Sequence, residues 1–596
     1  MINKKSLCIL TVFLVCAFIY SAGFLRAQES QLEQTIDTTG PASPLPKVFR
    51  PNVDLSGRGL NSADTGWPQM LAAKDVLMAW QNDVGFKGMY RIQFNLWEIN
   101  NYGKDEDVQD ELLENYENII KTISDSGGVV ILNLFSTPAG LGKVLDKKST
   151  PQDIKAFKGL VKSYIKKYSC DKRYNIWYEV WTAPDLDSFF LGRTQEYLNL
   201  YKAVAEAVKE LESESKIHIP IGGPSVSWWF QDIDSNNIMA PEKSLIYGLI
   251  KFCYRYKLPL DFISWHAYST DPRVESEITL YNKTPVSLIR AWLNYFHFDP
   301  NTPLIIDEWN FDSGYGLAAE RQDKSYIGAS YIPARIKKMQ AAGLDYQLFF
   351  ALEDFYNPKE GVARNLGIFS FDPLNPSASA KPKAIYNVFR MFSGLQGEML
   401  NTAPLNDEFV GLVATRSKDK VVVIVYNYVD PEITKSYLSR NLGSLVESER
   451  RFVLKLISSG QIDKILYRQQ DILKLKSTNR VRSMLTKAQE LNDAAKKYMI
   501  AERSIKLNFK NLKGDYVYQR YAVDSSCNAD CVFSPVEEKE VSLSETYSET
   551  LLLKPYSVNM IVFSNRPKAQ AQKEASAAIA APLNEVTAPP EAKKQE

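Results

Sequence analysis

Histidine and cysteine are scarce in this chain, and their scarcity argues against a metal site. The 596 residues include three His and six Cys, and no cluster of them has metal-ligand spacing, so we expect no metal and no other cofactor. Cys527 and Cys531 lie four residues apart in a polar stretch, where a disulfide can form in an oxidising compartment. Cys170 and Cys253 fall on separate predicted helices and are expected to be buried thiols.

A surplus of charge of one sign is also missing. The chain has 71 Lys and Arg against 70 Asp and Glu, a formal net charge of +1, so no overall field favours a nucleic-acid partner or a membrane surface. No Ser, His and Asp order with a nucleophile elbow is present. The first predicted strand is not followed by a Gly-rich phosphate loop, which disfavours a doubly wound sheet.

The N-terminus has the pattern of a secretory signal. Lys4 and Lys5 precede an apolar run over residues 7–25, and cleavage is expected after Gly23 or Ala27. The run is almost long enough to span a bilayer, so an uncleaved membrane tether is the alternative. With residues 1–27 as signal or anchor, both interpretations predict an exported protein, periplasmic or extracellular.

The central part of the chain predicts a (β/α)8 TIM barrel. Residues 28–45 are polar and contain Pro, which is typical of a linker, and residues 46–395 alternate short apolar strands with amphipathic helices. Eight such units match the barrel and its usual length. The predicted strands are one near Val53 and residues 89–96, 128–135, 175–181, 217–222, 261–266, 303–309 and 346–351. Predicted helices include residues 194–211, 245–256 and 325–342.

After residue 395 the pattern changes to strands without intervening helices. Residues 396–566 therefore predict a β-sandwich, with strands at 410–415, 421–428, 451–456, 504–509, 516–522 and 557–563. A helix-periodic insertion at 461–500 carries nine Lys and Arg for four acids. Such a run is usually a solvated helical pair, and the alternative is that it binds an acidic polysaccharide or a phosphate-bearing surface. Residues 567–596, rich in Ala, Pro, Lys and Glu, predict a disordered tail.

A carboxylate at one predicted strand end suits glycoside hydrolysis. In TIM-barrel enzymes the working residues lie at the C-terminal ends of strands. Alternation in residues 304–308 places Leu304, Ile306 and Glu308 on one face, so Glu308 ends an apolar column beside aromatic residues. Such a carboxylate can attack an anomeric carbon. The alternative is a structural, salt-bridged glutamate at the barrel mouth.

Four strand ends resemble glycoside hydrolase family 39, the clan A barrel family of β-xylosidases and α-L-iduronidases. They are Trp-His-Ala-Tyr-Ser at 265–269, Ile-Asp-Glu-Trp-Asn at 306–310, Gly-Gly-Pro at 222–224 and Tyr-Glu-Val-Trp-Thr-Ala-Pro-Asp-Leu at 178–186. The resemblance covers roughly residues 50–395, and a C-terminal β-sandwich is also usual in the family. It implies a retaining mechanism on a carbohydrate, with Glu308 as nucleophile. The predicted substrate-binding residues are His266, Tyr268, Trp181, Trp309 and Trp228.

One departure from the family pattern affects catalysis. The family signature reads Trp-Asn-Glu-Pro-Asp-Leu, and its Glu is the general acid/base, whereas this chain has Thr182 and Ala183 at the Asn and Glu positions. General acid catalysis contributes roughly 10²–10⁴-fold. Glu179 lies about 13 Å down the strand, too far for a retaining pair about 5–5.5 Å apart. Glu353 and Glu98, near other strand ends, are the more plausible substitutes.

Two hypotheses follow for the function. The chain is either a family-39-like retaining glycosidase whose acid/base is lost or relocated, or an inactive pseudoenzyme that binds a polysaccharide during its export or assembly. A structural surface protein without a sugar ligand is a third, less favoured interpretation. The first two predict that Glu308, His266 and Ala183 converge at one barrel mouth, with Trp181, Trp309 and Trp228 along the cleft.

Overall fold

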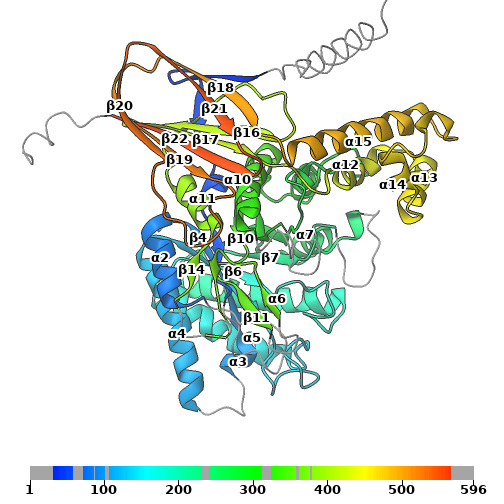
Figure 1. Cartoon of the computed structure of the whole chain (residues 1–596). Coiled ribbons are helices and arrows are strands. Elements are labelled where there is room, and N and C mark those ends of the chain that lie inside the picture. The colour runs from blue at the N-terminus through cyan, green and yellow to red at the C-terminus, as the bar shows by residue number, and fades with distance from the viewer. Residues whose placement is uncertain are drawn as a thin grey trace, which may run out of the picture.

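A computed structural model describes residues 31–57, 72–85, 87–100, 106–230, 241–311, 324–357, 362–372, 374–375 and 379–565. A barrel forms one end of the molecule and a pair of β-sheets the other, with a group of helices projecting beside the sheets (Figure 1). In these ranges we find no helix that is long and apolar enough to cross a membrane. The predicted signal or anchor at 1–27 and the predicted tail at 567–596 lie outside the described residues.

Eight parallel strands close into a barrel, as the sequence predicts. Their order around the barrel is β10-β3-β4-β5-β6-β7-β8-β9, so each strand pairs with its neighbour in sequence and the last pairs with the first. The strands are β3 (Val53–Asp54), β4 (Met89–Asn95), β5 (Val129–Phe135), β6 (Ile176–Val180), β7 (Ile221–Val226), β8 (Phe262–His266), β9 (Leu304–Trp309) and β10 (Tyr346–Phe349). Nearly all their residues are buried, since helices cover the outside.

Helices follow the strands and form the outer layer of the barrel. They are α2 (Lys74–Val84), α3 (Leu96–Ile99), α4 (Glu106–Asp125), α5 (Ile154–Ile165), α6 (Thr194–Ser215), α7 (Leu245–Tyr256), α8 (Pro285–Tyr295), α10 (Ser325–Ala342) and α11 (Ala384–Ser393). The three predicted helices are present, with α6 four residues longer than expected. Local signals set several starts: the side chain of Ser244 accepts the N–H of Tyr247 at the start of α7, and Pro285 opens α8. Short turns connect the layers: η1 (Lys47–Phe49), η2 (Lys166–Asp171), η3 (Pro241–Lys243) and η4 (Val274–Ser276). Short strands also do so: β11 (Phe355–Asn357), β12 (Val362–Arg364), β13 (Phe369–Ser370) and β14 (Lys381–Pro382).

Two sheets stack beside the barrel to form the predicted β-sandwich. The larger sheet has the order β2-β15-β16-β17-β22-β19-β20 and the smaller one β1-β18-β21. Strand β17, in the middle of the larger sheet, is buried on both faces: Val421, Val423 and Val425 face the sandwich core, whereas Val422 and Ile424 belong to the barrel core. The further strands are β15 (Glu398–Leu400), β16 (Val410–Arg416), β17 (Lys420–Asn427), β18 (Arg503–Lys510), β19 (Gly514–Val523), β20 (Glu537–Leu543), β21 (Thr546–Leu553) and β22 (Ser557–Asn565).

The predicted linker is wrong over its described part. Residues 32–37 form β1 (Leu32–Asp37), which pairs in parallel with β18, and residues 42–44 form β2 (Ala42–Pro44), which pairs with β15. Ile36 is fully buried in the sandwich core. The polar residues between the apolar ones suit an edge strand with one solvated face, and this pattern resembles a linker when no partner strand is in view.

The helical insertion begins earlier than the sequence predicts. It comprises α12 (Ile433–Asn441), η5 (Leu442–Ser444), α13 (Glu447–Ser458), α14 (Gln461–Leu466), η6 (Ile472–Lys474) and α15 (Asn479–Tyr498). The strand predicted at 451–456 is wrong, because this segment lies in α13. Val453 and Leu456, three residues apart, face a separate core together with Leu485 of α15. A short apolar run does not distinguish strand from helix by periodicity alone.

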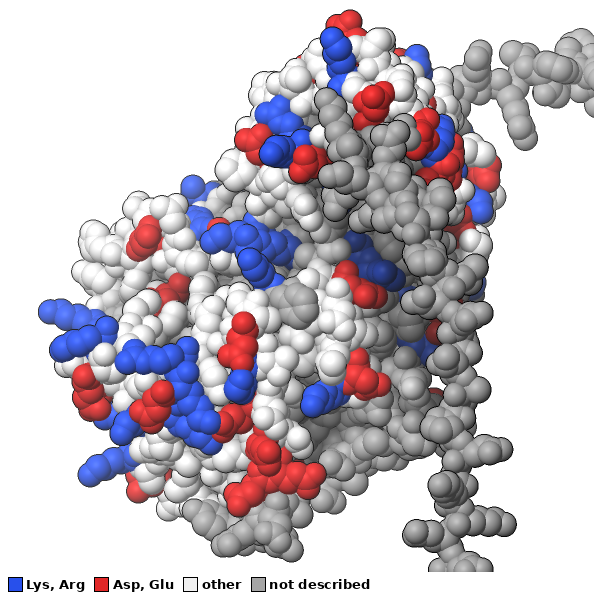
Figure 2. Space-filling model, turned by 90° about the vertical axis from the view of Figure 1, so that its left-hand side faces the viewer, with Lys and Arg blue, Asp and Glu red and all other residues white. Residues whose placement is uncertain are grey.

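Charge and cysteine pairing in the structure agree with the composition. On the face shown in Figure 2, acidic and basic side chains lie near one another over both the barrel and the β-sandwich. The predicted Cys527–Cys531 disulfide is present. Cys253 is a buried thiol as predicted, and Cys170 is partly buried.

Candidate active site

Glu308 lies at the barrel mouth, held by groups from two neighbouring strands. It occupies the C-terminal end of β9 and is 6% exposed. The Tyr268 hydroxyl, just after β8, donates to Glu308 Oε2 at 2.9 Å. His266 Nε2 lies 3.4 Å from Glu308 Oε1. One carboxylate oxygen therefore accepts from Tyr268, and the other faces the interior of the barrel.

Arg91 is the cation around which the site is organised. It points into the barrel from β4 and has no exposed side chain. Its Nη1 lies 2.6 Å from Glu308 Oε1 and 2.9 Å from Asp54 Oδ2, and its Nε lies 2.7 Å from Glu179 Oε2. Asp307 Oδ2 is 3.8 Å from Nε. A single guanidinium thus faces four buried carboxyl groups from strands β3, β6 and β9.

The remaining nitrogen of Arg91 contacts hydroxyl groups. Arg91 Nη2 donates to Thr182 Oγ1 at 2.9 Å and to Ser225 Oγ at 3.1 Å. The Ser225 hydroxyl also donates to Asp307 Oδ2 at 2.5 Å and lies 3.0 Å from His266 Nε2. These bonds tie β4, β7, β8 and β9 together and fix the position of the guanidinium that binds Glu308.

One cation cannot balance four ionised carboxylates inside the barrel, so their pKa values separate. Burial and the neighbouring Glu179 raise the pKa of Asp307 well above its ordinary value, and burial raises the pKa of Asp54 to about 6. Burial also raises the pKa of Glu308, against the opposing pull of Arg91. For Glu179 burial acts in the same direction, but Arg91 and the hydrogen bond with Asp307 outweigh it and lower its pKa.

His266 is neutral in this setting. Burial is the main reason that its pKa lies well below 6.5, and the nearby Arg91 charge lowers it further. A neutral imidazole beside Glu308 adds a hydrogen-bonding group without adding a second cation to the site.

Thr182 and Ala183 lie just after the C-terminal end of β6. Ala183 is 1% exposed and follows β6 with φ of +42°, and its N–H donates to the carbonyl oxygen of Ser225 at 2.8 Å. The Thr182 hydroxyl accepts from Arg91 and lies 3.5 Å from His266 Nε2. Thr182 and Glu308 thus both contact Arg91 and His266, and Ala183 directly follows Thr182 in the chain. Residue 183 therefore presents only a methyl group at this point of the barrel mouth.

A family model described as glycosyl hydrolases family 39 matches residues 141–436. This span holds the ends of β6, β7, β8 and β9, which build most of the site. The chain belongs to glycosyl hydrolase family 39. The β-xylosidase of Geobacillus stearothermophilus is 24% identical over 300 residues, which cover 47% of this chain and 53% of that protein. The β-xylosidase of Caldicellulosiruptor saccharolyticus is 33% identical over 131 residues, 22% of this chain and 23% of that one. The match therefore spans about half of one curated relative and about a quarter of the other.

Solved structures share the family 39 fold over nearly the whole chain. The GH39 enzyme from Xanthomonas axonopodis pv. citri has a TM-score of 0.59 at 15% identity, over 91% of this chain and 99% of that one. A monomeric β-xylosidase from Caulobacter crescentus CB15 also gives 0.59 at 15% identity, over 90% and 99%. At this identity the likeness concerns the fold, and it includes the region beyond the barrel.

Two of the predicted substrate-binding residues do not line the cleft. Trp181 is fully buried among Phe135 and Phe190, and its indole N–H donates to the carbonyl oxygen of Phe189. Trp309 is also fully buried. Its indole contacts β10 and α10 outside the barrel and donates to Gln347 Oε1 at 2.6 Å. The prediction that Trp181 and Trp309 bind substrate is therefore wrong.

The other two aromatic predictions have different outcomes. Tyr268 lies at the site, where its hydroxyl donates to Glu308, so its predicted role toward the sugar stays a prediction. Trp228, after β7, is partly buried and lines a cleft together with residues of the helical insertion. Substrate contact by His266 and Trp228 also stays a prediction.

The two carboxylates proposed as substitutes for the family acid are both buried. Glu353 is fully buried, and its Oε2 accepts the N–H of Ala73 at 3.2 Å. Glu98 is buried in the first turn of α3. The contacts described above for Glu308 involve Arg91, Tyr268 and His266, and include neither of these carboxylates.

Sequence reasoning missed Arg91, Asp54 and Ser225. A charged residue in the middle of a strand whose other residues are apolar or amide-bearing is a usable signal for Arg91, since an unpaired charge is costly to bury. Asp54 lies in a two-residue strand, and Ser225 follows the Gly-Gly-Pro motif of β7 by one residue. Those two residues carry no distinguishing local pattern, because only the closed barrel brings them to Arg91.

Replacing Asp54 with Asn should reduce the pH sensitivity of folding. Between 3.8, its ordinary pKa, and about 6, the folded state holds a proton that the unfolded chain releases, so this group makes stability fall as pH rises. Asn does not titrate. The unfolding free energy of Asp54→Asn relative to the unmodified chain should therefore rise by on the order of 2 kcal/mol from pH 4 to pH 6.5. Urea denaturation at both pH values measures this change. The exposed Asp125→Asn serves as control, and an equal change in both variants would contradict the expectation.

Proposed function

We propose that this family 39 chain is a retaining glycosidase that uses Glu308 as nucleophile and lacks a carboxylate at the acid/base position. The observation that carries the proposal is the cradle of Glu308. Arg91 and Tyr268 each hold one carboxylate oxygen, at 2.6 Å and 2.9 Å, so the group is oriented before substrate arrives. We further propose a β-xyloside-like substrate, because both curated relatives are named β-xylosidase.

The missing acid limits which bonds such a site can break. In the first step a Glu308 oxygen bonds to the anomeric carbon while the bond from that carbon to the leaving oxygen breaks. A leaving group with a low pKa departs as an anion, whereas an ordinary sugar hydroxyl needs a proton that Ala183 cannot donate. The second step also slows, because no carboxylate at this position activates the incoming water.

The unmodified protein is therefore expected to release dinitrophenol from dinitrophenyl β-xyloside far faster than it cleaves xylobiose. The glycosyl group should remain on Glu308, seen as a mass increase of the intact protein, and azide should speed turnover because it attacks without deprotonation. Release is measured by absorbance. Glu308→Gln is the control and should remove the dinitrophenol release, the adduct and the azide effect together. A broad panel of activated glycosides that yields no Glu308-dependent release would refute the enzyme assignment.

A binding role without catalysis is the second candidate function, and Thr182 and Ala183 favour it. After β6, Thr182 and Ala183 stand where the family signature has Asn and Glu, and the Thr182 hydroxyl is engaged by Arg91. In this alternative the barrel binds a polysaccharide during its export or assembly. The same panel separates the two candidates, since a binding protein would retain affinity for oligosaccharides without forming a glycosyl adduct.

We also propose that the chain is exported, with residues 1–27 as a cleaved signal or a membrane tether. The Cys527–Cys531 disulfide supports an oxidising compartment. N-terminal sequencing of protein recovered from periplasmic, culture and membrane fractions tests this. Recovery in the cytoplasmic fraction with Met1 retained would refute it.

A further inference from the structure

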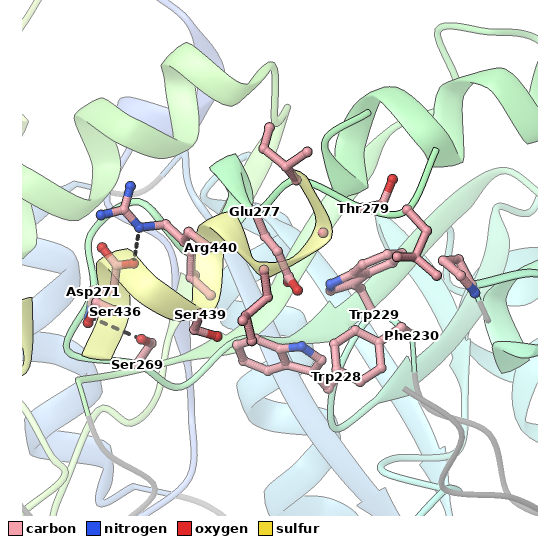
Figure 3. A pocket seen from close by; sticks show the side chains of 16 residues that line it. Trp228, Trp229, Phe230, Ser269, Asp271, Glu277, Thr279, Ser436, Ser439 and Arg440 are labelled. Carbon is pink, nitrogen blue, oxygen red and sulfur yellow. Dashed lines mark hydrogen bonds and ion pairs between the residues drawn. The ribbon is translucent and has the colours of Figure 1, made fainter. Parts of the chain in front are cut away.

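A cleft of about 340 Å³ lies between the barrel and the helical insertion. Trp228 and Phe230 line it from the loop after β7, and Glu277 lines it from the loop after β8 (Figure 3). Ser439 and Arg440 of α12 form the opposite wall. The volume is at the lower end of the range for small-ligand sites.

The insertion wall of this cleft is firmly attached to the barrel. Arg440 forms an ion pair with Asp271 at 2.6 Å, and its carbonyl oxygen accepts the N–H of Ile278 at 2.9 Å. Gly443 packs so closely on the backbone of Ile278 that an added Cβ would collide with it. The family model ends at residue 436, so most of this wall comes from the part of the chain beyond the match.

The cleft lies at the same end of the barrel as Glu308, because its lining residues Trp228 and Ser269 follow the C-terminal ends of β7 and β8. Ser269, in the cleft lining, directly follows Tyr268, which binds Glu308. Trp228 follows Ser225 by three residues, and Ser225 accepts the N–H of Ala183 on its carbonyl oxygen. Trp228 also lines a small pocket together with His266, whose Nε2 lies 3.4 Å from Glu308 Oε1, so the cleft lies next to the site.

We propose that this cleft binds a neutral glycosyl residue of the leaving group, with Trp228 as the ring that stacks on it. The proposal rests on the proposed function of Glu308, and it assigns the helical insertion a role in substrate recognition. A sugar ring presents C–H groups on its faces and hydroxyls at its edge. Trp228 and Phe230 match the faces, while Ser439 and Glu277 can bond the hydroxyls.

Charge in the cleft favours a neutral sugar over an acidic one. Arg440 is already paired with Asp271, so it offers no free positive charge to a carboxylate. Glu277 lies among aromatic rings, and burial raises its pKa to about 7, so near neutral pH it has a proton to donate to a sugar oxygen. An acidic sugar would meet two carboxyl groups and no unpaired cation among these residues.

Binding measurements on the full chain test this site. Calorimetry on the Glu308→Gln protein, which does not turn over, compares xylose with neutral β-linked tetrasaccharides of xylose, glucose, galactose and mannose. Adding Trp228→Ala should weaken binding of the preferred tetrasaccharide roughly tenfold and that of xylose much less, because a monosaccharide need not occupy the cleft. Ser439→Trp fills the cleft from an exposed position on the opposite wall and should have the same effect. Tyr295→Ala, on a ring 71% exposed at the end of α8, is the matched control.

The outcomes separate this inference from the proposed function. The cleft assignment would be overturned if the variants weakened the binding of xylose and of the tetrasaccharide equally, or if both cleft variants left the tetrasaccharide affinity unchanged. It would also be overturned if a uronic-acid tetrasaccharide bound more tightly than the neutral ones, or if no neutral tetrasaccharide bound. Release from dinitrophenyl β-xyloside by the unmodified protein, measured in parallel, reports on Glu308 alone. If the protein hydrolyses the activated xyloside but the cleft variants bind the tetrasaccharide normally, the glycosidase proposal holds and the cleft assignment fails. If the cleft variants lose tetrasaccharide affinity but no hydrolysis occurs, the protein binds sugars without cleaving them.

Discussion

Restoring the family residues with Ala183→Glu and Thr182→Asn should raise kcat/KM on glycosides with poor leaving groups by roughly 10²-fold or more. The new carboxyl group would supply the proton that the leaving oxygen lacks, and in the second step it would take a proton from water. The rate of the first step on dinitrophenyl β-xyloside, the release of dinitrophenol, should change far less, since that leaving group needs no acid. The ratio of the two rates, measured on xylobiose and the activated xyloside, is the readout.

Two companion variants distinguish proton transfer from a general structural effect. Ala183→Gln with Thr182→Asn has nearly the same shape and no proton to give, so it should show no gain on xylobiose. Ala183 is nearly inaccessible, so the thermal unfolding of both double variants must be compared with that of the unmodified chain. A folded double variant that forms the glycosyl adduct and still gains nothing on xylobiose would show that the missing carboxylate is not what limits this site.

Replacing Arg91 with Met should lower the unfolding free energy by about 3–5 kcal/mol, because it leaves buried carboxylates without their cation. Glu179, Glu308 and Asp54 each contact the guanidinium within 3 Å. Urea denaturation at pH 7 measures the loss, provided that the m-value stays constant. The same variant should also lose Glu308-dependent release from activated glycosides, since the nucleophile would no longer be held or ionised.

The pH dependence of the Arg91→Met penalty tests its electrostatic origin. Burial raises the pKa values of Asp54, Asp307 and Glu308, so lowering the pH protonates these groups and reduces the charge left unpaired. The penalty should therefore shrink between pH 7 and pH 4. Arg335, buried on α10 and paired with Glu275, offers a matched control for loss of a buried guanidinium away from the site. A penalty for Arg91→Met below about 1 kcal/mol, or one independent of pH, would contradict this account.

Much of the barrel could be predicted because its strands and helices follow local rules. Strand β9 shows this: the sequence predicts a strand at 303–309, and the structure has it at Leu304–Trp309, a difference of one residue. Helix α7 has the predicted bounds, residues 245–256, since Ser244 caps it and its apolar residues recur at helical spacing. The strand predicted at 451–456 failed because its short apolar run fits both periods, and packing against α15 selects the helix.

The amino-acid sequence by itself determined the order of strands and helices in the barrel, the resemblance to family 39, and the absence of a carboxylate at residue 183. These features depend on residues close together in the chain, where spacing alone carries the information. Only the tertiary structure decided that β1 pairs with β18, more than 460 residues away, and that α12 forms a wall of the cleft beside Trp228. Arg91 belongs to the same class, because its partners come from strands β3, β6 and β9. Closing the barrel removes water from all of them, and the resulting need to pair each buried charge makes their positions interdependent.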